Sequence, residues 1–420
     1  MNSYKRNFWF YSLGRLVSLI GSGVQQVAIP LFILDLTGSG TLMGTFVLVS
    51  MLPKIILGPF AGVLGDRFDR KKIMVYMDFV RGGLILFLAL LAGFDSLTLI
   101  SLLIVQALVS ASDMVFDPAT NAMIADIVPS EDLTRANSIV QGINSFSYIV
   151  GPALGGILYG FFGIELVFII NGTSFIASAI SEIFIAYSQT TEKTKMSVKK
   201  VLEDMKEGFI FLKDVKGLMI LLIFCMISNF LVSPVFVVIF PFFAREVVGF
   251  SGQQFGFLQT SWVVGILLGN VILGAFLAKR KPAKLFKSGL INQTLLFQLF
   301  FLAALPFSTK FFGGATWIYF SVIGSILMVT GIFNAFVNTP LMTMFHKKTP
   351  TKYRSRVFSV ISVLAQLVTP LGAVLYGIGL DLMATHWLLL IANIGSIIII
   401  VVFLARGLDT FLMEPKPNEA

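Results

Sequence analysis

A chain of 420 residues that is 56% hydrophobic and only 13% charged is too apolar for a soluble domain, in which about a quarter of residues are charged. Its mean hydropathy of +0.89 agrees. The apolar residues form long continuous runs instead of alternating strands, which excludes a β-barrel and predicts an all-α membrane protein.

Twelve of these runs are long enough, at roughly 20 residues each, to cross the bilayer as helices. We expect the helices at 8–35, 41–65, 73–94, 97–127, 136–160, 165–187, 217–244, 254–278, 284–306, 314–339, 355–380 and 385–406. The first run follows Lys5 and Arg6, but Arg15 interrupts it and no small-residue cleavage site follows. It is therefore expected to be a retained helix and not a signal peptide.

Nearly all of the 31 lysines and arginines fall in the two termini and in every second loop. The exceptions are Arg245 and Lys310 in the other loops and Arg15, Lys54 and Arg81 within helices. By the positive-inside rule this pattern places both termini in the cytoplasm and the chain in the cell membrane. The net charge of +9 then reports topology and contact with anionic lipid, not nucleic acid.

A polar stretch at 188–216 separates an N-terminal six-helix half, 1–187, from a C-terminal half, 217–406, and residues 407–420 form a cytoplasmic tail. Apolar residues recur at helical spacing in this linker, which predicts a helix on the inner membrane surface. The halves are weakly similar: GGILYG at 155–160 parallels GAVLYG at 372–377. Two pseudo-symmetric halves are typical of secondary transporters, whose substrate site lies between them near the midplane.

The fourth expected helix, 97–127, has a single polar face on an otherwise apolar surface. Its members are Gln106, Ser110, Asp113, Asp117 and Asn121. A carboxylate near the bilayer centre costs about 2.5–3.5 kcal/mol, and burial with mutual repulsion favours holding a proton. Asp113 and Asp117 are thus candidates for proton coupling, although Asp117 precedes Pro118 and could instead be the N-cap of a broken helix.

Other polar residues within the expected helices are candidates for lining the substrate cavity. With Gln106 and Asn121, they are Arg15, Ser22, Gln25, Gln26, Asn144 and Tyr148 in the first half and Asn229, Asn334, Asn338 and Gln366 in the second. Arg15 could be a counter-ion for the fourth or fifth helix, or it could extend to the membrane surface. Asp78 and Arg81 are spaced as a structural ion pair, whereas the sequence identifies no partner for Lys54.

Two motifs resemble those of a known family. GVLGDRFDRKK at 62–72 is similar to the loop between helices 2 and 3 of the major facilitator superfamily, with Asp69 in place of a glycine. Asp is among the few residues that tolerate positive φ. GPALGG at 151–156 resembles the helix-5 antiporter motif of its exporters. The resemblance covers the whole chain, is closest to macrolide-efflux exporters, and implies the major facilitator fold.

The first motif implies a gating latch formed by Asp66, Arg67, Arg70 and Asp126. Asp66 would cap the N-terminus of a neighbouring helix, which the family pattern suggests is helix 11, and Arg70 would pair with Asp126. The alternative is that the basic residues only enforce topology. The second motif, Gly151, Pro152, Gly155 and Gly156, implies close helix approach at a bend.

The resemblance implies a monomeric transporter that exports amphipathic, macrolide-like molecules by proton antiport and alternating access. The alternative is a lysolipid translocator or a siderophore or metabolite exporter of the same superfamily. One cysteine, two histidines and the lack of HExxH or phosphate-loop motifs argue against an enzyme, a metal site and any cofactor.

Overall fold

The computed structural model describes the backbone of residues 3–187 and 198–407, and their side chains except at 3, 61–67, 198, 406 and 407. These residues form two compact units. Unit 1 contains Met1–Leu36, Val49–Val198 and Ser251–Thr260, and unit 2 contains Thr37–Leu48, Lys199–Phe250 and Ser261–Ala420.

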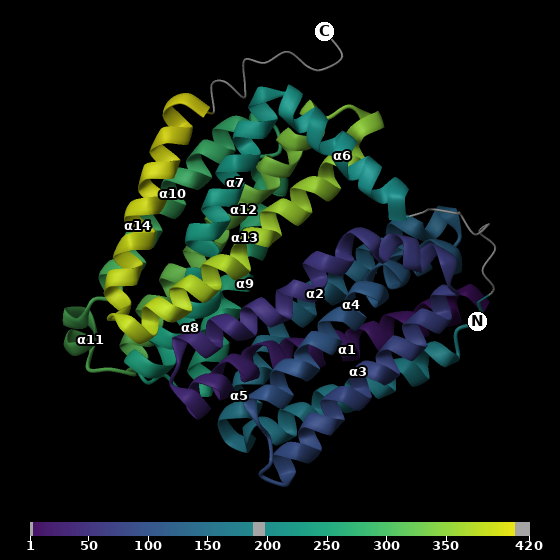
Figure 1. Cartoon of the computed structure of the whole chain (residues 1–420), viewed down its shortest axis with the longest axis horizontal. Helices are drawn as coiled ribbons and strands as arrows, with labels where there is room; N and C mark the ends of the chain where they lie inside the picture. Colours follow the sequence, from purple (N-terminus) through teal and green to yellow (C-terminus); the bar gives the residue numbers. More distant parts are fainter. Residues whose placement is uncertain (1–2, 188–197, 408–420) are drawn as a thin grey trace. The chain divides into compact units, whose positions relative to one another are not determined.

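The first five long helices contribute most of unit 1 (Figure 1). They are α1 (Ser3–Thr37), α2 (Gly40–Arg67), α3 (Arg70–Gly93), α4 (Leu99–Ile127) and α5 (Leu133–Ile183), the last preceded by the 3₁₀ turn η1 (Ser130–Asp132). Helix α3 packs against both α4 and α5, and some polar residues of these helices, among them Asp78, Arg81 and Glu182, are buried.

Helix α5 is continuous by hydrogen bonding but breaks at Gly163, where φ is +75°. Only glycine adopts this backbone conformation without strain. The described residues contain eleven helical segments apolar enough to span a membrane, and one of them, Ser130–Ile183, has 54 residues. At 1.5 Å per residue this segment would be about 80 Å long, enough to cross the bilayer twice. If the break at Gly163 divides it into two spans, the count agrees with the twelve predicted helices. The all-helical membrane fold is confirmed.

Unit 2 is also helical. Its elements are α6 (Val198–Asp214), α7 (Lys216–Pro234), η2 (Val235–Ile239), α8 (Phe240–Phe242), η3 (Phe243–Val247), α9 (Gly252–Phe276), α10 (Pro282–Ala303), α11 (Pro306–Phe312), α12 (Trp317–Lys348), η4 (Thr351–Tyr353), α13 (Arg354–Leu382), α14 (Thr385–Val402) and η5 (Phe403–Gly407). Segments α7, η2, α8 and η3 form one span of 32 residues.

Helix α6 lies in the linker, where the sequence predicts a surface helix. It docks through Leu212, which is fully buried in the core of unit 2. Asp204 lies 2.7 Å from the Arg356 guanidinium, and Glu207 pairs with the same group. A Cβ at Gly208 would come within 2.7 Å of the Arg356 backbone, so contact with α13 is close. Hydrophobic burial and ion pairing together fix α6 on this unit.

Two local expectations are wrong. Helix α4 continues through Pro118, so Asp117 is not the N-cap of a broken helix. Asp69 has φ −62° and not a positive φ. Its side chain accepts a hydrogen bond from the Lys72 backbone N–H at 3.0 Å. Asp69 is therefore the N-cap of α3, a position for which a carboxylate is among the preferred side chains.

Candidate transport site in unit 1

Three charged residues occupy the middle of three neighbouring helices. Asp113 lies fourteen residues from either end of α4, and Lys54 and Arg81 have similar central positions in α2 and α3. Each of these helices is long enough and apolar enough to span a membrane. The three charges are thus placed near the depth at which an isolated charge is most costly.

Asp113 is the centre of this cluster. Its Oδ2 lies 3.3 Å from Lys54 Nζ, and its Oδ1 accepts a hydrogen bond from Arg81 Nη1 at 3.0 Å. The side chains of Asp113 and Lys54 are 22% and 39% exposed, whereas that of Arg81 is buried. Asp113 therefore joins a partly accessible cation to a buried one. The sequence of α4 alone suggests that Asp113 has no counter-ion, but residues of α2 and α3 supply two. Lys54, for which the sequence identifies no partner, pairs with Asp113.

Arg81 is enclosed by charge and aromatic rings. It pairs with Asp78 one turn earlier in α3, as the sequence spacing predicts. Its guanidinium carbon lies 3.8 Å from the centroid of Phe116 and 4.6 Å from that of Phe175. Cation–π contacts of this kind strengthen when water is excluded. Two carboxylates and two rings from α3, α4 and α5 thus hold one guanidinium.

Glu182, near the end of α5, belongs to the same region and was not identified from the sequence. The residue is only 2% exposed, and its electrostatic neighbours include Asp78, Arg81 and Ser178. The only sequence signal was a carboxylate that follows Ser181 inside an apolar run. Because it lies near the end of that run, the pattern did not separate it from a loop residue.

The second proton-coupling candidate, Asp117, is exposed one turn after Asp113. Asn121 is exposed one further turn along α4. On the opposite side of Asp113, Gln106 donates to Ser110 at 3.2 Å. The polar face of α4 is therefore real, but only its middle residue carries ion pairs to other helices within the described residues.

The cavity candidates on α1 and α5 divide into paired and exposed residues. Arg15 Nε donates to Asn144 Oδ1 at 3.1 Å, so its partner comes from the fifth predicted helix. Gln25 is buried and accepts from Asn171. Ser22 donates to a backbone carbonyl of its own helix. The exposed members are Gln26 and Tyr148. Gln25 thus joins two helices, while Gln26 and Tyr148 lie at the surface of the helices.

The candidates in unit 2 form hydrogen bonds with uncharged groups, one between two helices and two within a helix. Asn229 donates to the Ala365 carbonyl at 3.3 Å, and Asn338 donates to Asn334 at 2.9 Å within α12. Gln366 donates to Ser362 at 2.9 Å within α13. Within the described residues, none of these hydrogen bonds involves a charged side chain, in contrast to the central cluster of unit 1.

The motif at 62–72 places Arg70 at the first position of α3. Arg70 Nη1 lies 2.7 Å from Asp126 Oδ2, the contact that the resemblance implies, and the Tyr187 hydroxyl donates to the same oxygen at 2.9 Å. Partial burial and the bond to Asp126 raise the pKa of the Tyr187 phenol above its usual range. The side chains of Asp66 and Arg67, the remaining latch candidates, lie outside the described residues.

The motif at 151–156 brings α5 very close to other backbones. A Cβ at Gly155 would lie 2.5 Å from the Val24 carbonyl oxygen of α1. One at Gly151 would lie 2.8 Å from the Gly23 Cα, and one at Gly156 would lie 2.2 Å from the Gly252 carbonyl. Pro152 is buried between them. These distances leave no room for a side chain, so the small residues permit the approach.

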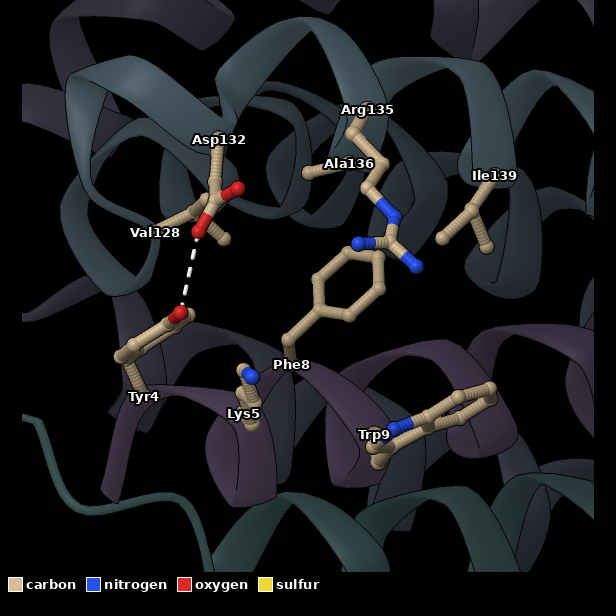
Figure 2. Close-up of a pocket in the computed structure, with 9 residues that line it drawn as sticks. All are labelled: Tyr4, Lys5, Phe8, Trp9, Val128, Asp132, Arg135, Ala136 and Ile139. Atoms are coloured by element: carbon tan, nitrogen blue, oxygen red, sulfur yellow. Dashed lines mark hydrogen bonds between the residues drawn. The ribbon is translucent and has the colours of Figure 1, made fainter. Parts of the chain in front are cut away.

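A small cavity of about 160 Å³ lies at the start of α1 and of α5 (Figure 2). Tyr4 donates to Asp132 at 3.0 Å on one side of it, and Lys5, Phe8 and Arg135 are among its other lining residues. None of the predicted substrate residues lines this cavity. The described residues contain no group of three or more His, Cys, Asp or Glu that could hold a metal.

Comparison with known proteins agrees with this architecture. The family model of the Major Facilitator Superfamily matches residues 11–373. Macrolide efflux protein A from Streptococcus pyogenes is 28% identical over 390 residues, 93% of each chain. A protein of the same name from Enterococcus faecalis is 27% identical over 335 residues, 79% of this chain and 100% of the relative.

Among solved structures, a bacterial homologue of the iron transporter ferroportin in an inward-facing state matches with a TM-score of 0.74 at 16% identity, covering 96% of this chain and 98% of that one. At this identity the likeness establishes the fold alone. The family match spans most of the sequence and includes the helices that carry the charged cluster. The chain belongs to the Major Facilitator Superfamily and is a multi-pass membrane transporter, not an enzyme.

Proposed function

We propose that the protein exports amphipathic small molecules across the cell membrane in exchange for protons, by alternating access of a single chain with both termini in the cytoplasm. The observation that carries this proposal is the partly accessible Asp113 at mid-membrane depth, ion-paired to Lys54 at 3.3 Å and hydrogen-bonded to Arg81 at 3.0 Å. A charge cluster that served only the fold would not need an accessible member.

The cluster suits coupling because different cations can satisfy the same carboxylate. Asp113 can be neutralised by a proton, by a cationic substrate, or by Lys54 and Arg81. Each option leaves the two basic side chains with a different set of partners. A ligand that favours one arrangement shifts the population of the conformation to which that arrangement belongs. Proton and substrate then affect the same equilibrium without occupying the site together.

An apolar surface for the body of such a substrate exists in unit 2. The rings of Phe236 and Trp262 lie 4.8 Å apart, and Phe297 and Phe300 lie within 6.5 Å of Phe236. Both Phe236 and Trp262 are half-buried, which leaves ring surface for contact. Aromatic walls with few polar groups are typical of sites for bulky apolar ligands. The macrolide efflux relatives favour a macrolide-like substrate over a small polar one.

The test is transport by the purified protein in proteoliposomes with an imposed proton gradient. The panel contains a macrolide, a permanently charged lipophilic cation, a lysolipid and a siderophore. The proposal predicts gradient-driven accumulation of the macrolide or the cation, abolished by a protonophore. Accumulation of only the lysolipid or the siderophore would favour the alternative function, and transport that ignores the gradient would reject proton antiport.

Asp113→Asn tests the role of the cluster in the same assay. The variant should lose uphill accumulation of the cation yet retain passive exchange down a gradient, because the carboxylate is required for coupling and not for passage. If it pumps the cation uphill with the parental pH dependence, Asp113 is not the coupling residue. Asp117→Asn is then the next variant to measure.

A further inference from the structure

Two buried carboxyl groups lie behind the accessible cluster. The Asp78 side chain is completely buried, and Glu182 is 2% exposed. Each retains one oxygen, Asp78 Oδ2 and Glu182 Oε2, that makes no hydrogen bond within the described residues. Buried polar atoms are seldom left in this state, so the two oxygens mark a place where a hydrogen is expected.

The surrounding charges do not neutralise both groups. Arg81 pairs with Asp78 and also with Asp113, and Lys54 pairs with Asp113. Glu182 forms no ion pair within the described part of the chain, although Asp78 and Arg81 are its electrostatic neighbours. One guanidinium therefore serves two aspartates while a third carboxyl group has no cation of its own.

The groups that face Glu182 come from three helices. From α3 they are Asp78 and Arg81, from α1 the Tyr11 phenol, and from α5 itself the Ser178 hydroxyl. Ser178 is near both carboxyl groups, but its oxygen makes no hydrogen bond of ordinary geometry. Arg81 is therefore the only cation among these facing groups.

Two carboxylates in such a site cannot both remain ionised at low cost, because burial penalises each charge and the charges repel each other. One shared proton removes the repulsion and supplies the missing hydrogen-bond donor. The proton then belongs to the pair and not to either residue.

We propose that Asp78 and Glu182 form a proton site that binds one proton and releases it when a cationic substrate engages Asp113, with Arg81 connecting the two places. The proposal rests on the exporter function above and specifies where the exchanged proton resides. Asp113 can then remain ionised for the substrate cation, while the pair holds the proton that is exchanged for it.

The coupling follows from the shared guanidinium. In the structure Arg81 is divided between Asp113 and Asp78. A substrate cation at Asp113 replaces Arg81 there, and the guanidinium then pairs fully with Asp78. The added positive charge favours ionisation of the pair. The O–H bond of the shared proton breaks, its electron pair remains on the carboxylate, and the proton leaves to water. Loss of the cation reverses each step.

The first test needs no substrate. Infrared difference spectra of the purified protein between alkaline and acidic buffer should contain a carboxylic acid C=O band from the pair. The band should disappear in Glu182→Gln and shift in Asp78→Asn. Glu165→Gln is the matched control, because Glu165 is an exposed carboxylate on the same helix, and it should leave the band unchanged. A band that persists unaltered in both Glu182→Gln and Asp78→Asn would overturn the proton site.

The second test measures proton release on addition of tetraphenylphosphonium, a cation that carries no exchangeable proton, to protein in weakly buffered detergent. The wild type should acidify the medium, and Glu182→Gln should bind the cation without acidification. Equal acidification by Glu182→Gln would place the proton elsewhere and leave the exporter proposal standing. If the wild type shows the infrared band but neither binds nor transports the cation or a macrolide, the exporter proposal fails and the coupling step fails with it.

Discussion

The helices of unit 1 carry charges at their centres, whereas the described spans of unit 2 carry charges only near their ends. In unit 1, Lys54, Arg81 and Asp113 meet at mid-helix. Unit 2 instead contains aromatic contacts between its helices, such as Phe236 with Trp262 and Phe240 with Phe300. Under the proposed function, unit 1 responds to protons and cations and unit 2 holds the apolar body of the substrate.

The difference matters because the two kinds of core respond differently to change. Removing a side chain from an aromatic core leaves a cavity, and the cost depends on how far the neighbouring side chains can relax into it. Removing one partner from a buried ion network instead leaves the remaining charge without compensation. Substitutions can therefore show which unit couples and which unit recognises.

The largest effect is expected for Arg81→Met. This change leaves Asp78 buried without a counter-ion, and breaking a buried pair in this way costs about 3–5 kcal/mol. We expect little folded protein by size-exclusion chromatography and a large drop in thermal stability. The double variant Asp78→Asn with Arg81→Met removes both charges and should recover part of the loss. Equal instability of the single and double variants would mean that Arg81 acts through its ring contacts with Phe116 and Phe175.

The next effect concerns close packing, which both units share. Gly155→Leu in unit 1 and Gly265→Leu in unit 2 should each abolish transport, because their Cβ atoms would lie 2.5 Å and 2.0 Å from carbonyl oxygens of Val24 and Met328. Overpacking of this kind typically costs about 1–3 kcal/mol. Gly142→Leu is the control on α5, since a Cβ there meets nothing within 4 Å. Parental transport by Gly155→Leu would remove the packing role from the motif.

A smaller and more selective effect is expected for Trp262→Ala in unit 2. Loss of an aromatic pair contact of about 0.5–1.5 kcal/mol corresponds to a roughly two- to tenfold weaker apparent affinity for a macrolide. The dependence of transport on the proton gradient should not change, because Trp262 lies outside the charged cluster. If coupling is lost while affinity is retained, the division of labour between the units is wrong.

Much of the fold could be predicted from the sequence because lipid imposes a simple rule: backbone polar groups must be satisfied within each apolar run. The polar face of α4 and the spacing of Asp78 and Arg81 follow from helical periodicity. The contact of Arg70 with Asp126 was implied by the family motif. Each of these depends on local geometry or on a recognised pattern.

The remainder depends on which helix faces which. Periodicity places Asp113 on one face of α4 but does not say that Lys54 of α2 and Arg81 of α3 face it. Pro118 suggested a break because proline removes one backbone hydrogen bond, yet tertiary packing keeps α4 continuous. Glu182 was missed because its burial comes from α1 and α3 and not from its own surroundings in the sequence.

The smallest effect on stability is expected in Arg70→Ala, at the motif at 62–72 of unit 1. The Arg70 and Asp126 side chains are only partly buried, and ion pairs in such positions typically contribute up to about 1 kcal/mol. Transport should nevertheless fall, since the pair is proposed to form in only one gate state and its loss shifts the conformational balance. The measurement is thiol labelling at the inner mouth, with Cys225 replaced, alongside transport. Lys72→Ala is the control because the exposed Lys72 side chain is expected to act only on topology. Unchanged labelling and full transport in Arg70→Ala would reduce the motif to a positively charged loop, and unit 1 would then contribute its central charges but no latch.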